Sequence, residues 1–255
     1  MRLNVNADLG ESYGSFVMGN DAALLGIVGT ANVACGMHGG DPLVMRDTIL
    51  RAREAGVSIG AHPGYADLHG FGRRAMHLSD AELEALLIYQ IGAIAKMGCV
   101  LGWPITHVKP HGALNNQACA DARMAGVIAR IIARCDASLI LLAPVLSELA
   151  SAGTEAGLRV ALEVFADRTY EPDGQLTPRS IDGAVLHDPM QARDHVMRMV
   201  EAGGIVTRQG NVIATAFHSI CLHGDGCAAL ETARAVTDTL RSHGHLVEPL
   251  DRLFA

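Results

Sequence analysis

The stretch Thr106-His107-Val108-Lys109-Pro110-His111-Gly112-Ala113 lies near the middle of the 255-residue chain. An apolar lead-in, residues 104–108, is followed at once by a cation, a proline that restricts the backbone, an imidazole and a glycine. The chain has only two lysines, Lys96 and Lys109, among 20 lysine and arginine residues, so Lys109 does not have the character of ordinary surface charge. The pattern predicts a buried strand that emerges at a reaction site.

Similar strand patterns recur along the chain and alternate with helical patterns. Strand-like segments occupy residues 3–6, 31–34, 57–61, 104–108, 139–142, 159–164 and 219–222. Helical segments occupy residues 21–28, 42–55, 79–97, 120–135, 189–202 and 228–243, with a further helix after Pro144 and an extended segment at 211–216. Such alternation predicts parallel strands joined by crossover helices. We therefore expect an α/β fold in which residues 1–255 form one TIM-like (β/α) barrel domain, seven-stranded or irregular, rather than an open sheet.

Two of these helices begin with clear capping signals. Asp41 can accept from free backbone N–H groups, and Pro42 suits the first helical position. Ser79 followed by Glu82 has the spacing of a capping box.

Composition excludes several classes of function. The net charge is -7, the isoelectric point is about 5.9, and no lysine or arginine cluster occurs, which disfavours nucleic-acid binding. There is no apolar run of 18 residues and no signal peptide, so we predict no membrane span and a cytoplasmic protein. The six cysteines lack CxxC or zinc-finger spacing and are expected to be reduced, with Cys35 and Cys221 buried. Motifs of the GxxxxGK[ST], GxGxxG and GxSxG types are also missing from the sequence.

The notable polar residues follow the predicted strands. Because a barrel carries its functional residues at the C-terminal ends of its strands, side chains that are distant in sequence would meet at one mouth. They are Asp8, His38, His62, Lys109, His111, Asp167, Arg168, His223 and Asp225.

Asp8 and Lys109 each have a chemical and a structural interpretation. Asp8 shares a strand face with Asn6 and is suited to hold a metal or act as a general base, or else it caps the next turn. Lys109 would stabilise an anionic intermediate, or form an ion pair inside the barrel with Glu163.

Four histidines are candidates for catalysis, substrate contact or metal binding. His62, His111 and His223 each lie at a strand end with a glycine one or two residues later, and three equivalent positions favour chemistry over structure. His38 lies close to glycines, where a loop hydrogen bond and a substrate contact are equally reasonable. Asp8, His62 and His111 could form a metal site, but HxxxH or HExxH spacing is missing, so a divalent metal is left open.

The loops contain candidate anion-binding arginines. Arg73, Arg74 and Arg168 are placed to bind a carboxylate or phosphate bidentately, or else to tie down their own loops. Residues 165–183 have little periodicity and are predicted to form a lid loop.

Seven sequence blocks, in unchanged order between residues 4 and 249, resemble the LamB/YcsF lactam-utilisation family. They are Asn6-Ala7-Asp8-Leu9-Gly10-Glu11-Ser12, Ala31-Asn32-Val33-Ala34-Cys35-Gly36-Met37-His38-Gly39-Gly40-Asp41-Pro42, Gly60-Ala61-His62-Pro63-Gly64-Tyr65, Gly70-Phe71-Gly72-Arg73-Arg74, Val108-Lys109-Pro110-His111-Gly112-Ala113-Leu114, Phe165-Ala166-Asp167-Arg168 and Ile220-Cys221-Leu222-His223-Gly224-Asp225. Departures from the usual family residues at Met37, Gly39, Ala66 and Asn115 concern substrate preference more than reaction type.

The resemblance implies a barrel similar to the glycoside hydrolase/deacetylase superfamily and a defined reaction. That reaction is the opening of the lactam 5-oxoproline to L-glutamate at the expense of ATP, performed with companion subunits B and C. Because the chain has no nucleotide-binding motif, we expect those subunits to carry much of the phosphorylation. The residues expected to contact substrate are Asn6, Asn32, His38, Asp41, Arg73, Arg74, Asp167, Arg168, His223 and Asp225.

In this hypothesis the expected catalytic roles fall on four residues. Asp8 positions or deprotonates water, directly or through a metal, and Lys109 stabilises the developing anion. His111 or His62 protonates the leaving nitrogen. The alternatives are a metal-dependent deacetylase or amidase that acts alone, and a non-catalytic lactam-binding subunit. Oligomeric state, including a homo-oligomer, and the preferred lactam are left open.

Overall fold

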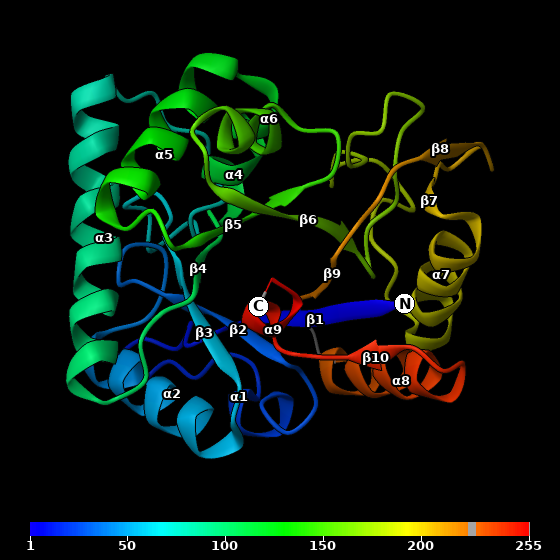
Figure 1. Ribbon diagram of the computed structural model, residues 1–255, viewed down its shortest axis with the longest axis horizontal. Helices are drawn as coiled ribbons and strands as arrows, with labels where there is room; N and C mark the ends of the chain where they lie inside the picture. The colour runs from blue at the N-terminus through cyan, green and yellow to red at the C-terminus, as the bar shows by residue number, and fades with distance from the viewer. Residues whose placement is uncertain (224–227, 255) are drawn as a thin grey trace.

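Seven parallel strands close into a barrel in the computed structural model, which describes residues 1–223 and 228–254 (Figure 1). Each strand pairs with the next along the chain, and the last pairs with both β6 and β1, which closes the ring. The predicted TIM-like barrel is therefore confirmed. Its strands are β1 (Arg2–Leu9), β2 (Thr30–Ala34), β3 (Ser58–His62), β4 (His107–Val108), β5 (Ile140–Pro144), β6 (Arg159–Phe165) and β9 (Ser219–Leu222).

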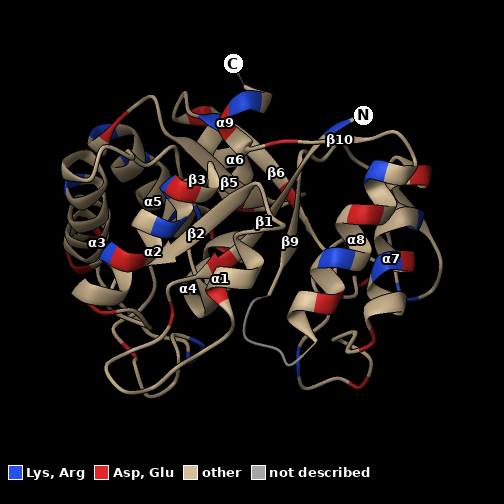
Figure 2. Cartoon of the chain, turned by 90° about the horizontal axis from the view of Figure 1, so that it is seen from below, with Lys and Arg blue, Asp and Glu red and all other residues tan. Residues whose placement is uncertain are grey.

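Helices follow the strands and cover the outside of the barrel (Figure 1). They are α1 (Asp21–Leu24), α2 (Pro42–Ala55), α3 (Asp80–Val100), α4 (Gly112–Ala120), α5 (Ala122–Cys135), α6 (Glu148–Glu155), α7 (Pro189–Ala202), α8 (Ala229–Ser242) and α9 (Leu250–Leu253). Charges of both signs alternate along α7 and α8 (Figure 2). A hairpin of β7 (Gly204–Val206) and β8 (Val212–Ala214) lies outside the ring, and β10 (Leu246–Val247) pairs with the start of β1.

The predicted caps are present. Asp41 accepts from the backbone N–H groups of Leu43 and Val44 at 2.8 and 3.0 Å, and Ser79 and Glu82 form both halves of a capping box.

The helix predicted over residues 120–135 is confirmed as α5, whereas α4, which lies directly before it, was not predicted. The Asp121 side chain accepts from the Met124 N–H at 3.1 Å and so caps a new helix, α5, directly after α4. The predicted fourth strand is also shorter than expected, since Pro104 and Pro110 on either side of β4 have no N–H for a sheet hydrogen bond.

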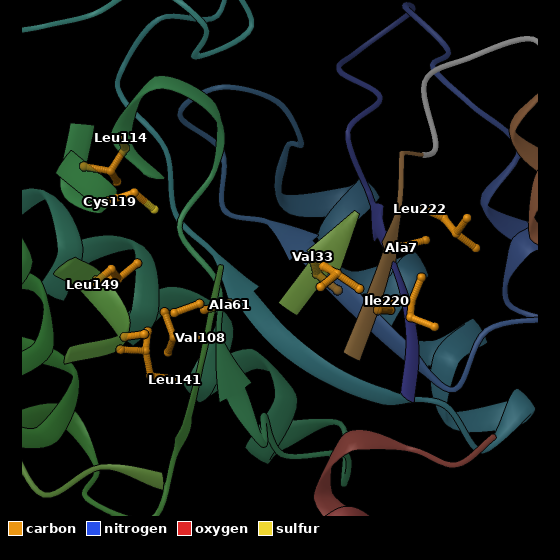
Figure 3. Close-up of a cluster of buried hydrophobic side chains, with 14 of the residues drawn as sticks. Ala7, Val33, Ala61, Val108, Leu114, Cys119, Leu141, Leu149, Ile220 and Leu222 are labelled. Carbon is orange, nitrogen blue, oxygen red and sulfur yellow. The ribbon is translucent and has the colours of Figure 1, made fainter. Parts of the chain in front are cut away.

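Side chains alternate between two environments along each strand. One set of side chains on β1 is buried in the apolar shell between the barrel and the helices: Leu3, Val5, Ala7 and Leu9. The same shell contains residues of the following strands, namely Val33, Ala61, Val108 and Leu141 (Figure 3). Polar residues of β1 at positions 4, 6 and 8 are also buried, and they bond to side chains of other strands within the ring. Leu250 of α9 packs on Ile140, Leu142 and Ala161 and closes the N-terminal end.

Helix α3 is, among the residues described, the one helix whose length and apolar composition would let it cross a membrane. The prediction of no membrane span considered only uninterrupted apolar runs. Helix α3 contains charged residues, but its length and its average hydropathy are those of a helix that could span a membrane. One face of α3, with Leu83, Leu87, Ile91 and Ile94, is buried, and the helix contacts β3 and α5. A core helix of this kind satisfies the same criterion, so the feature is weak evidence for a membrane.

Candidate active site

The C-terminal ends of the strands bring the main candidate residues to one place. A small pocket of about 40 Å³, which we call the reaction pocket, is lined by Asp8, His62, Lys109, His111 and His223 together with other residues. These five side chains come from the ends of β1, β3, β4 and β9 and span more than 200 positions of sequence. The barrel closure is what brings them together.

Lys109 is buried at the base of this pocket among anionic and polar groups. Its Nζ lies 3.0 Å from Asp8 Oδ1, 3.3 Å from Glu163 Oε1 and 3.0 Å from Cys221 Sγ. Burial by itself lowers the pKa of Lys109, but Asp8, Cys221 and Glu163 outweigh it and raise the pKa well above its usual value. Lys109 is therefore a permanent cation. It forms the ion pair with Glu163 that the structural interpretation predicted and also faces the reaction pocket.

Asp8 is ionised because its neighbours lower its pKa more than burial raises it. Burial raises the pKa of Asp8, but His62 and then Lys109 lower it more, so the net pKa is well below its usual value. Asn32 Nδ2 donates to Asp8 Oδ1 at 2.9 Å and to Asn6 Oδ1 at 2.7 Å. Asn6 and Asn32 were predicted to bind substrate, but neither lines the reaction pocket: Asn32 holds Asp8, and Asn6 donates to Glu163 Oε1 at 2.8 Å.

His107 completes this support. Its Nε2 lies 2.9 Å from Asn32 Oδ1, and burial is the main cause that lowers its pKa to about 3. The ring is therefore neutral, and an N–H at Nε2 orients the amide of Asn32 so that its NH₂ faces Asp8.

His62 and His111 have fixed tautomers. His62 Nδ1 lies 2.7 Å from the Lys109 carbonyl oxygen, and His111 Nε2 lies 2.8 Å from the Phe71 carbonyl oxygen. A carbonyl only accepts, so each of these nitrogens carries the ring proton. The remaining nitrogens, His62 Nε2 and His111 Nδ1, face each other at 3.0 Å, and His62 Nε2 also lies 3.3 Å from Asp8 Oδ2. Burial first, and then His62, lower the pKa of His111 well below its usual value, which disfavours a second proton on the His111 ring.

Glu11 and His38 extend this pair into a cluster of four metal-ligating groups. Glu11 Oε1 lies 3.3 Å from His38 Nε2 and 3.6 Å from His111 Nδ1, and the His38 ring stacks on His111 with centroids 3.7 Å apart. One donor atom from each of Glu11, His38, His62 and His111 lies within 4.8 Å of all the others. Facing lone pairs, with the opposite nitrogens bonded to carbonyls, are the arrangement of imidazole ligands around a metal.

The donor set fits a divalent transition metal such as zinc. It differs from the predicted set of Asp8, His62 and His111, because Glu11 and His38 join the two histidines. Asp8 lies beside the cluster, with Oδ2 at 3.3 Å from His62 Nε2. Sequence reasoning missed Glu11, since it follows the end of β1, where strand alternation no longer tells which way a side chain points.

Two glycines let the backbone pass close to these rings. A Cβ at Gly64 would lie 2.6 Å from His38 Nδ1. A Cβ at Gly72 would lie 2.7 Å from His38 Cβ and 2.9 Å from His111 Cδ2, and Gly72 also has a φ of +61°. No other residue type fits these two positions without moving the rings.

His223 and Asp167 form a separate pair across the pocket. His223 Nδ1 lies 2.8 and 2.7 Å from the two Asp167 oxygens. Burial raises the pKa of Asp167, but His223 outweighs it and the net pKa is lowered, so the carboxylate is ionised and accepts the Nδ1 proton. Arg179 Nη2 lies 3.4 Å from the other ring nitrogen, Nε2.

The predicted lid, residues 165–183, is an ordered loop. Isolated bridges pair Arg168 with Val185 and Tyr170 with Leu176. Arg168 is buried, and its Nη2 donates to the Thr177 carbonyl at 2.6 Å. Leu176 and Arg179 of this loop line the reaction pocket, so the loop forms one of its walls. Arg179 was not identified from the sequence, because nothing in a loop without periodicity marks which residue faces inward.

Of the other predicted arginines and acids, some line the reaction pocket and others have structural roles. Arg73 lines the reaction pocket. Arg74 is ion-paired with Asp67 and does not line it, so the structure favours the alternative in which Arg74 ties down its loop. Asp41 caps α2 and also accepts from the Gly14 N–H at 2.8 Å, which is a structural role as well. Asp225 lies outside the described residues.

Comparisons with known proteins agree with the fold and with the sequence blocks. The model of the LamB/YcsF family matches residues 3–255. The A subunit of the 5-oxoprolinase of Azoarcus sp. (strain BH72) is 54% identical over 244 residues, covering 96% of this chain and 95% of that protein. The crystal structure of the lactam utilization protein from Thermus thermophilus has a TM-score of 0.93 and 41% identity, covering 98% of this chain and all of that one.

A more distant structure shares the fold alone. The catalytic domain of the peptidoglycan N-acetylglucosamine deacetylase from Eubacterium rectale ATCC 33656 has a TM-score of 0.50 and 9% identity, covering 96% of this chain and 87% of that chain. This likeness is in keeping with the deacetylase-like barrel expected from the sequence blocks.

Proposed function

The chain belongs to the LamB/YcsF family, and on that basis we propose that it opens the ring of 5-oxoproline, a five-membered lactam, to give L-glutamate. Companion subunits B and C couple this reaction to ATP hydrolysis. The observation that carries the proposal is the meeting of an ionised carboxylate, a permanently charged lysine and a histidine–aspartate pair in one small pocket. Ring opening of a stable amide needs these three kinds of group.

The first requirement is activation of the amide. Transfer of the ATP γ-phosphoryl group to the ring oxygen gives a cyclic imidate phosphate and ADP. One water then adds to the ring carbon and the C–N bond breaks, which leaves an acyl phosphate and the free amine. A second water releases phosphate and completes L-glutamate. We assign the phosphoryl transfer to companion subunits, because this sequence has no phosphate-binding loop of the GxxxxGK[ST] type.

Asp8 is the group that positions the attacking water. Its ionised carboxylate accepts from the water while Lys109 and Asn32 hold its other oxygen. A divalent cation held by Glu11, His38, His62 and His111 would supply Lewis acidity beside Asp8, which lowers the pKa of water. Cation binding at this cluster is part of the proposal.

Lys109 stabilises the anion that develops as water adds. A fixed cation in a buried pocket interacts strongly with the negative charge that develops on the water-derived oxygen as it loses its proton, because little water screens it. Its contacts with Asp8 and Glu163 hold the ammonium group before the reaction begins, so little reorganisation is needed.

His223 is the proton donor to the leaving ring nitrogen. His62 and His111 were the expected donors, but each directs one ring nitrogen at a backbone carbonyl, and we assign the proton transfer to His223 instead. His223 lines the reaction pocket, and its Nδ1–H bond to Asp167 stabilises the ring in its protonated form. The protonated ring then donates from Nε2 to the nitrogen as the C–N bond breaks.

The experiment is a reconstitution with separately purified subunits. Glutamate release from 5-oxoproline and ATP is measured with this chain, with its companion subunits, and with all of them together. We expect release only from the complete set. Full release by the companion subunits alone would favour the non-catalytic alternative.

A second function rests on the imidazole cluster. Four metal-ligating groups on a deacetylase-like barrel are also suited to a metal-dependent amidase that acts alone. Hydrolysis of an acetylated sugar by the isolated, metal-loaded chain without ATP would establish that alternative and refute the proposed one.

A further inference from the structure

A second cavity adjoins the reaction pocket. It has a volume of about 430 Å³ and extends between the start of α4 and the loop of residues 166–188. Arg73, Arg168 and Arg179, with Asn115 and Asn116, line both this cavity and the reaction pocket, so these residues form the boundary between the two. A ligand whose reacting atom lies beside Asp8 would extend past this boundary.

The wall of the cavity is strongly cationic. Among its described lining residues there are three arginines and no aspartate or glutamate. The uncharged polar residues Asn115, Asn116 and Gln175 add hydrogen-bonding groups. The helix α4 also begins at this wall, with Gly112 and Ala113 in the lining, and its N-terminal end adds a partial positive charge.

Arg168 is held in place by backbone carbonyl oxygens, and the Asp167 carboxylate also interacts with it electrostatically. Its guanidinium donates to the carbonyl oxygens of Thr177 and Ala184 at 2.6 and 3.3 Å. Burial, and then repulsion from Arg179, lower the pKa of Arg168 to about 10, so it is still charged at neutral pH. A buried cation that repels a neighbouring cation stabilises the fold poorly, but it is well arranged to receive an anion.

We propose that Arg73, Arg168 and Arg179 form a subsite for a phosphoryl dianion carried on the ring oxygen of the activated lactam. This inference rests on the proposed function and deepens it, because it defines the form in which the substrate reaches this chain. The ring occupies the reaction pocket and the phosphoryl group lies at the boundary with the larger cavity. A reaction that phosphorylates an amide oxygen must therefore precede the step that takes place here.

The charge of the wall favours phosphate over the carboxylate of the substrate. A carboxylate carries one negative charge and two oxygens, which one bidentate arginine satisfies. Three guanidiniums around one boundary match a group with two charges and three terminal oxygens. Phosphoryl transfer sites use arginines for the same electrostatic reason.

The test is calorimetric titration of the isolated chain with inorganic phosphate, and separately with acetate, at constant ionic strength. We expect saturable phosphate binding that is tighter than acetate binding. Arg179→Gln, at an exposed position of the loop, should weaken phosphate binding about tenfold or more, and Arg73→Gln should do the same. Arg134→Gln on α5, whose side chain is 70% exposed and distant from both cavities, is the matched control and should leave the affinity unchanged.

Three results would overturn the subsite. They are no saturable phosphate binding by the unmodified chain, equal weakening in Arg134→Gln, and acetate binding that matches phosphate and depends equally on Arg179. Thermal melting of each variant separates lost binding from lost folding, and the exposed Arg179 provides the test even if Arg73→Gln unfolds. The titration does not depend on ring opening. Absence of phosphate binding with glutamate release retained would refute the subsite alone. Phosphate binding without glutamate release would refute the proposed function alone.

Discussion

His62 Nε2 and His111 Nδ1 face each other at 3.0 Å, while the opposite nitrogen of each ring lies within hydrogen-bonding distance of a backbone carbonyl. Two facing lone pairs repel unless a cation lies between or beside them. Glu11 supplies a negative charge on the same side, and His38 supplies a third imidazole. Two carbonyl oxygens therefore fix which nitrogen of each ring faces the cluster, and this orientation suits the metal binding that we propose.

Removal of one ring of the cluster should abolish metal binding. The chain purified with zinc available should contain about one equivalent by elemental analysis. His111→Ala should lose most of it, since even the loss of a ligand's hydrogen-bond partner reduces metal affinity by about tenfold to 100-fold. His243→Ala, at an exposed position after α8, is the control and should retain the metal. Equal metal content in His111→Ala would contradict the assignment.

Lys109→Met should lower glutamate release by the reconstituted assembly on the order of 100-fold to 1000-fold. It should also reduce the free energy of unfolding by about 3–5 kcal/mol, because Asp8 and Glu163 would be left buried without their partner. Lys96→Met, which changes the other lysine at an exposed position on α3, is the control for both measurements. Full activity in a folded Lys109→Met variant would remove Lys109 from the mechanism.

Asp167→Asn should slow the reaction by about 100-fold to 10,000-fold, because the amide does not stabilise a protonated His223 ring. Single-turnover rates of glutamate formation measure this loss. Asp194→Asn, on the exposed surface of α7, should leave the rate unchanged. An unchanged rate in Asp167→Asn would assign the proton to another group.

The stability of the metal-free chain should fall with pH below about 6.5, the ordinary pKa of histidine. Burial is the largest cause that lowers the pKa values of His38, His107 and His111, that of His107 to about 3. The unfolded chain therefore binds protons on these rings before the folded chain does, and each ring costs about 1.4 kcal/mol per pH unit until its folded pKa is reached.

Urea unfolding at several pH values between 7.5 and 5.5 measures this slope. His243→Asn should leave it unchanged, since that ring is exposed in the folded chain and titrates in much the same way after unfolding. A free energy of unfolding that stays constant over this range would mean that the three rings take up protons over the same pH range in the folded chain as in the unfolded chain.

Gly64→Ala should displace His38 and reduce both stability and metal affinity, because the new Cβ would lie 2.6 Å from His38 Nδ1. Overpacking of this kind costs about 1–3 kcal/mol. Gly92→Ala on α3 is the matched control, since a Cβ there meets nothing within 4 Å, and it should stabilise the helix by about 0.5–1 kcal/mol. Unchanged metal affinity in Gly64→Ala would show that His38 is not a ligand.

The barrel and most of its elements follow from patterns that are local in sequence. Strand alternation on β1, the Asp41 cap and the Ser79–Glu82 capping box each depend on residues a few positions apart, so they can be recognised without tertiary information. Helix α4 was missed, because it begins at Gly112 without a capping side-chain hydrogen bond, so the usual local signal for a helix start is lacking there.

The placement of Asp8, His62, Lys109 and His223 around one pocket follows from a general property of barrels, in which the ends of parallel strands meet at one mouth. The sequence by itself therefore determined the fold and the residue types available for chemistry.

Tertiary structure decided how those residues are used. Glu11 joins His111 across 100 positions, and Arg179 reaches His223 from a loop with no periodic pattern. The ring protons of His62 and His111 are assigned by the carbonyl oxygens of Lys109 and Phe71. Every residue has a backbone carbonyl, so the residue type does not predict which carbonyl will accept a hydrogen bond from a histidine ring. Only the folded chain brings a particular carbonyl to a particular ring, and that contact decides which ring nitrogen faces the pocket.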